Sequence, residues 1–223
     1  NVLRIAISYN SFDVLEDGYG INLRPLSMFA ASAYRDDPCT RFKPHILDQN
    51  IYDVVDPGLV AKMHKAITVI QFKVEGQIIK RHPEYGLNHR CLLEQVDFDK
   101  GTVEVDGKTY PMLDMKFPTI DPKDPLKLTE QEAELLQTLK MSFRHSGLLH
   151  KHIKFLYSHG SMYKCCNNNL LYHGCIPLKK DGSFDDIVFY GIPYSGKALM
   201  DFVDQMVQSA YFLPESNPDK GVA

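Results

Sequence analysis

The sequence predicts an α/β (α+β mix) fold in which helices outnumber strands. Between residues 57 and 82, apolar residues recur at steps of three and four, which is typical of an amphipathic helix. Around Asp106-Gly107 the chain instead alternates between apolar and polar residues, and Asp-Gly supplies the positive φ angles of a two-residue hairpin turn. A composition of 44% hydrophobic and 11% aromatic residues over 223 positions suits a packed globular chain.

The helix over residues 57–82 has clear start and stop signals. Asp56 supplies a capping carboxylate before Pro57, which is favoured at the first helical position. Pro83 disfavours helical geometry for the residue before it, so the helix should end at His82. Similar periodicity or capping predicts further helices over residues 2–7, 21–35, 130–143, 147–159 and 196–210, whereas residues 16–20 are expected to form a turn.

Two hairpins and one extended connector complete the prediction. The first hairpin joins residues 102–105 to residues 108–110, and the second has strands over 162–166 and 170–173 with a turn at 167–169. Between the first hairpin and the helix at 130, prolines and aspartates predict an extended connector over residues 111–125.

Charge and composition exclude several classes of function. The 25 basic and 28 acidic residues give a net charge of −3, so we expect no nucleic-acid partner. Apolar runs of about five residues fall far short of the roughly 20 that span a bilayer, so we expect no membrane segment and a cytoplasmic protein. Five cysteines, an odd number, favour reduced thiols over a disulfide framework. The ends of the chain indicate a fragment of a longer protein.

The strongest local signal for chemistry is the segment LLYHGCIP at residues 170–177. It places His173 at the end of an apolar strand, where a neutral imidazole is a good ligand for Mn²⁺, Zn²⁺ or iron. A core histidine bonded to the backbone is an equally acceptable interpretation of the spacing. One histidine cannot form a hydrolytic metal site, and the chain lacks Asp-x-His, Gly-Asp-x-x-Asp, Gly-Asn-His and Gly-His motifs.

Other candidate residues carry weaker signals. Cys165, Cys166 and Cys175 near His173 do not have the spacing of a known zinc site, and no base is placed beside Cys175. His152 belongs to a basic helix that could meet sugar phosphates, although a solvated helix face is the simpler reading. Lys197, at a predicted helix start, could bind an anion or could simply belong to a helix cap. Arg24 could also bind an anion, or could form a surface ion pair.

Seven segments together resemble one protein family, the class 3 or Firmicutes-type fructose-1,6-bisphosphatases, and they extend over nearly the whole chain. They are LEDGYGINL (15–23), DDPC (36–39), QFKVEGQIIKRHP (71–83), FPTIDP (117–122), GSMY (160–163), LLYHGCIPL (170–178) and YSGKAL (194–199).

The resemblance implies a calcineurin-like metallophosphatase αββα sandwich with a helical and β-hairpin insertion. It assigns residues 1–55 and 129–223 to the phosphatase domain and residues 56–128 to the insertion. It also implies removal of the 1-phosphate of fructose 1,6-bisphosphate in gluconeogenesis, with a dinuclear Mn²⁺ site. His173 is the position that matches a metal ligand of the family, and the other ligands are expected outside this chain, in a protein nearly three times as long.

Two other functions stay open at the level of sequence: a non-catalytic helical interaction module and a sugar-phosphate sensor. The expected partner is a small-molecule sugar bisphosphate, with Arg24, His152 and Lys197 as candidate contacts. The sequence leaves homo-oligomer formation open.

Overall fold

The computed structural model describes residues 1–45, 56–172, 174–214 and 216–217. The chain divides into two compact units, residues 1–147 and residues 148–223, each of which is described by itself. None of the described helices is long and apolar enough to cross a membrane.

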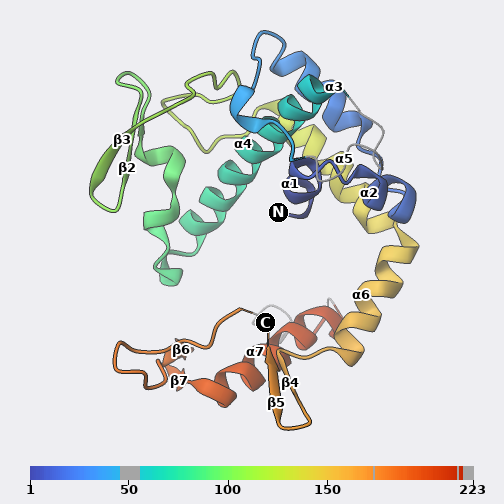
Figure 1. Ribbon diagram of the computed structural model, residues 1–223, viewed down its shortest axis with the longest axis vertical. Helices are drawn as coiled ribbons and strands as arrows, with labels where there is room; N and C mark the ends of the chain where they lie inside the picture. Colours follow the sequence, from blue (N-terminus) through green and yellow to red (C-terminus); the bar gives the residue numbers. More distant parts are fainter. Residues whose placement is uncertain (46–55, 173, 215, 218–223) are drawn as a thin grey trace. The chain divides into compact units, whose positions relative to one another are not determined.

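Unit 1 is mainly helical and is organised around one long helix, α4, the teal helix that runs through this unit in Figure 1. Helices α1 and α3 pack against α4, and α5 packs against α3. Its helices are α1 (Val2–Ser8), α2 (Phe12–Tyr19), α3 (Arg24–Ala33), α4 (Pro57–Arg81) and α5 (Glu130–His145). Short 3₁₀ helices cover Thr40–Phe42, Pro83–Tyr85, Asn88–Arg90 and Leu92–Gln95.

The predicted limits of α4 are confirmed. The Asp56 side chain accepts a hydrogen bond from the backbone N–H of Gly58 at 2.9 Å, and Pro57 is the first helical residue. The helix ends at Arg81, with His82 as its C-cap before Pro83. The predicted capping box of α5 is also present, because Thr129 and Glu132 exchange side-chain to backbone hydrogen bonds.

The sheet of unit 1 is small and antiparallel, with strand order β1-β2-β3. Its strands are β1 (Val96–Asp97), β2 (Thr102–Val105) and β3 (Lys108–Pro111). The turn between β2 and β3 is the predicted Asp106-Gly107, and both residues have positive φ angles, 50° and 71°. An apolar cluster lies where α4 meets the 3₁₀ segments and the connector after β3: Val69, Leu93, Ile120 and Leu126, with Phe72, Phe98 and Phe117 packed against it.

Unit 2 contains two hairpins and a terminal helix. Helix α6 (Gly147–His159) begins at the last residue of unit 1 and is followed by β4 (Tyr163–Cys166), β5 (Asn169–Tyr172), β6 (Ile187–Phe189), β7 (Ile192–Tyr194) and α7 (Gly196–Phe212). β4 pairs with β5 and β6 pairs with β7, in two separate antiparallel sheets.

The structure corrects the sequence prediction at two elements. Residues 16–19, predicted as a turn, form the last turn of α2, which passes through Gly18 and ends at Gly20 with a φ of 67°. The hairpin β6–β7 is absent from the prediction, because its turn uses Tyr190 at a φ of 52° before Gly191, and tyrosine is not a usual turn residue at positive φ.

The mixed class of helices and strands is confirmed. In the described residues, the strands form three small antiparallel sheets, so the αββα sandwich stays an expectation for the longer protein. The assignment of residues 1–55, 56–128 and 129–223 to phosphatase domain and insertion stays a prediction too.

Candidate functional site

The hairpin β4–β5 carries the strand that the sequence analysis singled out. Its turn residues Asn167 and Asn168 have φ angles of 49° and 58°, as a tight two-residue turn requires. The register pairs Tyr163, the first residue of β4, with Tyr172, the last residue of β5. These two tyrosines therefore mark the open end of the hairpin. His173 follows Tyr172 in the sequence and lies outside the described residues.

The open end of this hairpin is linked to α7 by three polar groups. The Tyr163 hydroxyl donates to Asp201 Oδ1 at 2.9 Å, and Lys197 Nζ donates to Asp201 Oδ2 at 2.5 Å. The same ammonium lies 5.6 Å from the centroid of the Tyr163 ring. Hydrogen bonds from Lys197 and Tyr163 lower the pKa of the Asp201 carboxyl, and the hydrogen bond with Asp201 raises the pKa of Lys197.

An apolar hollow of about 280 Å³ lies beside this polar cluster in unit 2. Gly196 allows close packing at its edge, because a Cβ there would stand 3.2 Å from the Phe184 ring and the φ of Gly196 is +50°. The residues that line the hollow are Tyr163, Cys165, Leu170, Tyr172, Ile176, Phe184, Gly196, Lys197 and Met200.

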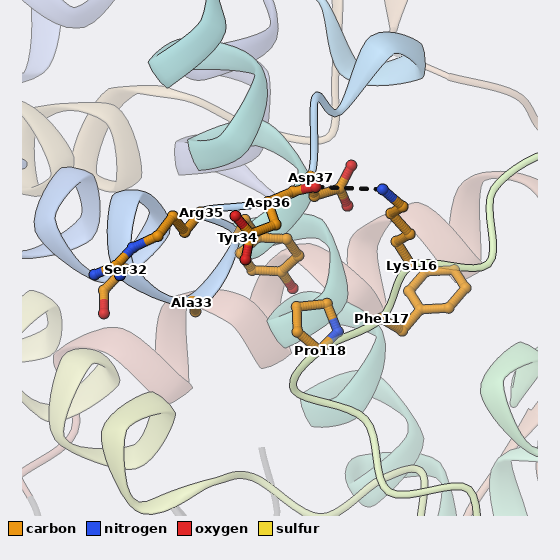
Figure 2. Close-up of a pocket in the computed structure, with 9 residues that line it drawn as sticks. All are labelled: Ser32, Ala33, Tyr34, Arg35, Asp36, Asp37, Lys116, Phe117 and Pro118. Carbon is orange, nitrogen blue, oxygen red and sulfur yellow. Dashed lines mark hydrogen bonds between the residues drawn. The ribbon is translucent and has the colours of Figure 1, made fainter.

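A second hollow, of about 530 Å³ and open to solvent, lies in unit 1 (Figure 2). One wall is the end of α3 with residues 32–37, and the other is the connector at residues 116–118. Two lysines donate to backbone carbonyls of the turn that follows α3: Lys62 to Arg35 O at 2.7 Å, and Lys116 to Asp36 O at 3.3 Å. These two ammonium groups are therefore engaged by the turn after α3.

Behind this hollow lies a fully buried lysine, Lys65 of α4. Its ammonium donates to Asp37 at 2.6 Å and to Asp114 at 2.7 Å. Three aromatic rings face the same ammonium with centroids between 5.1 and 5.9 Å away: Tyr34, Phe42 and Phe117.

Two groups near Lys65, the Asp37 carboxyl and the Cys39 thiol, have shifted pKa values. Burial by itself would raise the pKa of Asp37, but hydrogen bonds from Lys65 and from the Cys39 backbone N–H lower it below its usual range. Burial raises the pKa of the Cys39 thiol to about 12, and the charge of Asp37 adds to that rise. The Asp37 carboxylate is thus engaged by an ammonium and an amide, which leaves it poorly suited to act as a base.

A second buried lysine, Lys73, lies two turns further along α4. Its ammonium donates to Glu132 Oε2 of α5 at 2.7 Å and to the backbone oxygen of Thr119 at 2.6 Å. Both side chains of the ion pair are fully buried. Because Lys65 binds Asp114 and Lys73 binds Thr119, both lysines attach the connector between β3 and α5 to the long helix.

The described residues do not fit a metal centre. Among residues 1–45, 56–172, 174–214 and 216–217, no group of three His, Cys, Asp or Glu side chains is placed to hold an ion. Cys165, Cys166 and Cys175 are exposed, and the first two are successive strand residues whose side chains point to opposite faces.

Comparison with known proteins identifies the family. The sequence model of the family described as "Firmicute fructose-1,6-bisphosphatase" matches residues 1–222. Proteins named "Fructose-1,6-bisphosphatase class 3" from Finegoldia magna, Clostridium novyi and Listeria monocytogenes are 50%, 48% and 47% identical to it. Each alignment covers 100% of this chain. The chain belongs to the Firmicute fructose-1,6-bisphosphatase family.

The chain covers only part of its relatives in this family. It spans 34%, 33% and 34% of the three bisphosphatases named above, which is about a third of their length. No solved structure matches the chain significantly.

The residues proposed from the sequence as substrate contacts lie in both units. Arg24 begins α3 in unit 1, with an exposed side chain that forms no ion pair among the described residues. His152 and Lys197 belong to unit 2, where His152 is an exposed residue of α6 and Lys197 contacts Asp201 and Tyr163. The roles of Arg24, His152 and Lys197 in substrate binding and of His173 in metal binding stay predictions.

The polar clusters that the structure reveals in this chain were not predicted from the sequence. Lys197 and Asp201 are four residues apart on one helix, and that spacing is a usable signal for an ion pair. Lys65 and Lys73 interrupt the apolar face of α4, which could have marked them as buried lysines in need of partners.

Proposed function

We propose that the protein containing this chain is a fructose-1,6-bisphosphatase that hydrolyses the 1-phosphate of fructose 1,6-bisphosphate in gluconeogenesis. The observation that carries the proposal is the family match over residues 1–222, together with relatives of about 50% identity that bear this name. A chain that spans about a third of these relatives supplies part of such a protein.

The proposal includes a dinuclear Mn²⁺ cofactor with His173 as one ligand. Support comes from the resemblance of residues 170–178 to the family's His-Gly strand end. The remaining ligands are proposed to lie outside this chain, which agrees with the lack of a metal-binding group in its described part. A cytoplasmic location belongs to the same proposal, which leaves the oligomeric state open.

Phosphate release from fructose 1,6-bisphosphate tests the proposed activity directly. The assay compares this 223-residue chain with the protein extended at both ends to the length of its relatives, each with and without Mn²⁺. We expect Mn²⁺-dependent release by the extended protein only, and its loss in the His173→Ala variant with the fold retained. An inactive extended protein would overturn the proposed activity.

Three results would change the proposal. Release by the 223-residue chain alone would mean that its site is complete, contrary to the proposed position of the other ligands. Full activity of the extended His173→Ala variant would remove the ligand assignment. Tight binding of the sugar bisphosphate without turnover would favour the sensor over the enzyme.

A further inference from the structure

A mainly apolar groove of about 380 Å³ lies in unit 1 between α1, α4 and α5. Its floor includes Ile67, Ile70 and Val74 of α4, and α1 contributes Val2 and Leu3. The other residues that line it are Asn1, Gln71, Glu75, Leu136 and Phe143. Every lining residue lies within residues 1–147, so the groove is a feature of unit 1 alone.

Helix α4 is apolar on two opposite faces. One face carries Val69 and Gly76, which pack against the apolar cluster that contains Leu126. With about 3.6 residues per turn, Ile67 and Val74 lie on the opposite face, which lines the groove. A helix that is apolar all round is typically covered on all sides. The groove face of α4 therefore lacks a cover that the other face has.

The apolar surface of the groove continues onto exposed side chains. Val2 is 61% exposed, and Ile5, one turn later in α1, is 49% exposed. Ile78, one turn after Val74 in α4, is 40% exposed. Residues three or four apart share one helix face, so these side chains extend the apolar stripes of both helices. Such a groove fits an amphipathic helix, whose apolar residues are spaced three, four and seven apart.

The polar side chains of the groove are paired with one another. Gln71 Nε2 donates to Asn1 Oδ1 at 2.5 Å and to Glu75 Oε1 at 2.8 Å. Gln71 Oε1 accepts from Arg4 Nε at 3.1 Å. A small-molecule site instead has polar groups that converge on the ligand and fix its orientation. The groove is therefore better suited to an apolar helix face than to a sugar phosphate.

We propose that this groove is the docking site for an amphipathic helix from the part of the longer protein that lies outside this chain. The chain spans about a third of its relatives, so such a protein has ample chain beyond it. A segment of the same protein reaches the groove at a roughly millimolar effective concentration, which favours it over a second copy. The inference depends on the length of the relatives and not on the proposed activity.

Hydroxyl-radical footprinting with mass spectrometry tests the docking site, because it reports the exposure of individual side chains. The experiment compares the 223-residue chain with the protein extended at both ends. We expect oxidation of Val2, Ile5 and Ile78 to fall about threefold or more in the extended protein, because a docked helix covers them. Val14 of α2, which is 54% exposed and does not line the groove, should be oxidised equally in both proteins.

Two matched variants test the groove itself. Val2→Asp and Val14→Asp each place a carboxylate in the first turn of a helix, where negative charge is favourable. In the extended protein, Val2→Asp should restore most of the oxidation of Ile5 and Ile78, whereas Val14→Asp should leave them covered. In the 223-residue chain both variants should melt close to the wild type, because both positions are exposed there. Coverage that persists in Val2→Asp would place the covering segment elsewhere.

Three further outcomes would overturn the docking site. Unchanged oxidation of Val2 and Ile5 in the extended protein would mean that nothing covers the groove. An equal fall at Val14 would mean that the added chain shields unit 1 without using the groove. Oxidation of Val2 in the 223-residue chain that falls as its concentration rises would assign the groove to a second copy of the chain instead.

Discussion

Two lysines of α4, Lys65 and Lys73, are fully buried and carry their charge into the interior of unit 1. Burial of an ammonium group is tolerated only when partners replace its water. Each lysine has such partners: two carboxylates for Lys65, and one carboxylate with a backbone oxygen for Lys73. Such pairs add little net stability over an apolar core, but removing one member leaves the other charge unpaired.

Replacement of Lys73 by methionine should destabilise unit 1 strongly. Glu132 would lose its only ion-pair partner while fully buried, and its Oε1 already has no hydrogen-bond partner among the described residues. We expect Lys73→Met to lower the free energy of unfolding by about 3–5 kcal/mol. Urea unfolding followed by circular dichroism measures this loss.

A double variant tests the cause of that loss. In Lys73→Met/Glu132→Gln the buried charge is absent, while the glutamine can still accept the hydrogen bond from Thr129 N–H that Glu132 accepts now. The double variant should therefore be more stable than Lys73→Met alone. Equal stability of the two would show that the unpaired charge is not the cause.

The cysteines should separate into two groups by reactivity. Cys39 and Cys91 are buried, and burial raises the pKa of both thiols, for Cys39 to about 12. At pH 8 the reactive thiolate form of Cys39 is therefore nearly absent, and that of Cys91 is scarcer than in a free cysteine. In this chain we expect Ellman's reagent to label the three exposed cysteines, Cys165, Cys166 and Cys175, within minutes and the other two only after denaturation. Rapid labelling of Cys39 in the native chain would contradict its burial.

Among the elements, α4 depends on a close approach at Gly76. A Cβ at this position would stand 2.5 Å from Leu126 Cδ2, and Leu126 belongs to the apolar cluster. An alanine gains about 1 kcal/mol of helix propensity. Overpacking of a buried contact costs about 1–3 kcal/mol, so the steric cost should exceed that gain.

We therefore expect Gly76→Ala to reduce stability by up to about 2 kcal/mol in urea unfolding. The matched control is Gly147→Ala, where a Cβ meets no atom within 4 Å, so that variant should be neutral or slightly stabilised. In a double-mutant cycle, Gly76→Ala should reduce the free energy of unfolding less in a Leu126→Ala background than in the wild type. Additive effects would mean that the two side chains do not compete for space.

At the scale of the whole molecule, the two units differ in how much apolar surface they bury. Of the buried hydrophobic residues in the described part of the chain, only Leu199 and Met200 belong to unit 2. Unit 2, the smaller unit, also leaves Phe155, Val188 and Tyr190 more than 60% exposed. We therefore expect the part of the longer protein outside this chain to cover apolar side chains of unit 2.

Hydrogen exchange should reveal this difference between the units. In the 223-residue chain we expect the amides of α4 to exchange more slowly than those of α7, because α4 is surrounded by buried side chains. In the extended protein the α7 amides should become more protected. Equal protection of α7 in both proteins would show that the added chain does not cover unit 2.

Much of the local structure was predictable because its signals are local. Asp56 with Pro57 marked the start of α4, the Thr129 capping box marked α5, and Asp106-Gly107 marked a hairpin. Prediction was wrong at α2, where interactions along the helix outweigh the weak propensity of Gly18, and it missed the turn at Tyr190. The candidate site was predicted only as single residues, because their partners are distant in the sequence.

The sequence by itself determined most of the long helices, the first two hairpins, the family and the motif around His173, since each depends on neighbouring residues or on a continuous segment. Only the tertiary structure decided which charges are buried and which side chains meet. Lys73 and Glu132 are 59 residues apart, and Tyr163 and Asp201 are 38 apart. Such contacts depend on how the elements pack, and periodicity along a single helix or strand does not encode that packing.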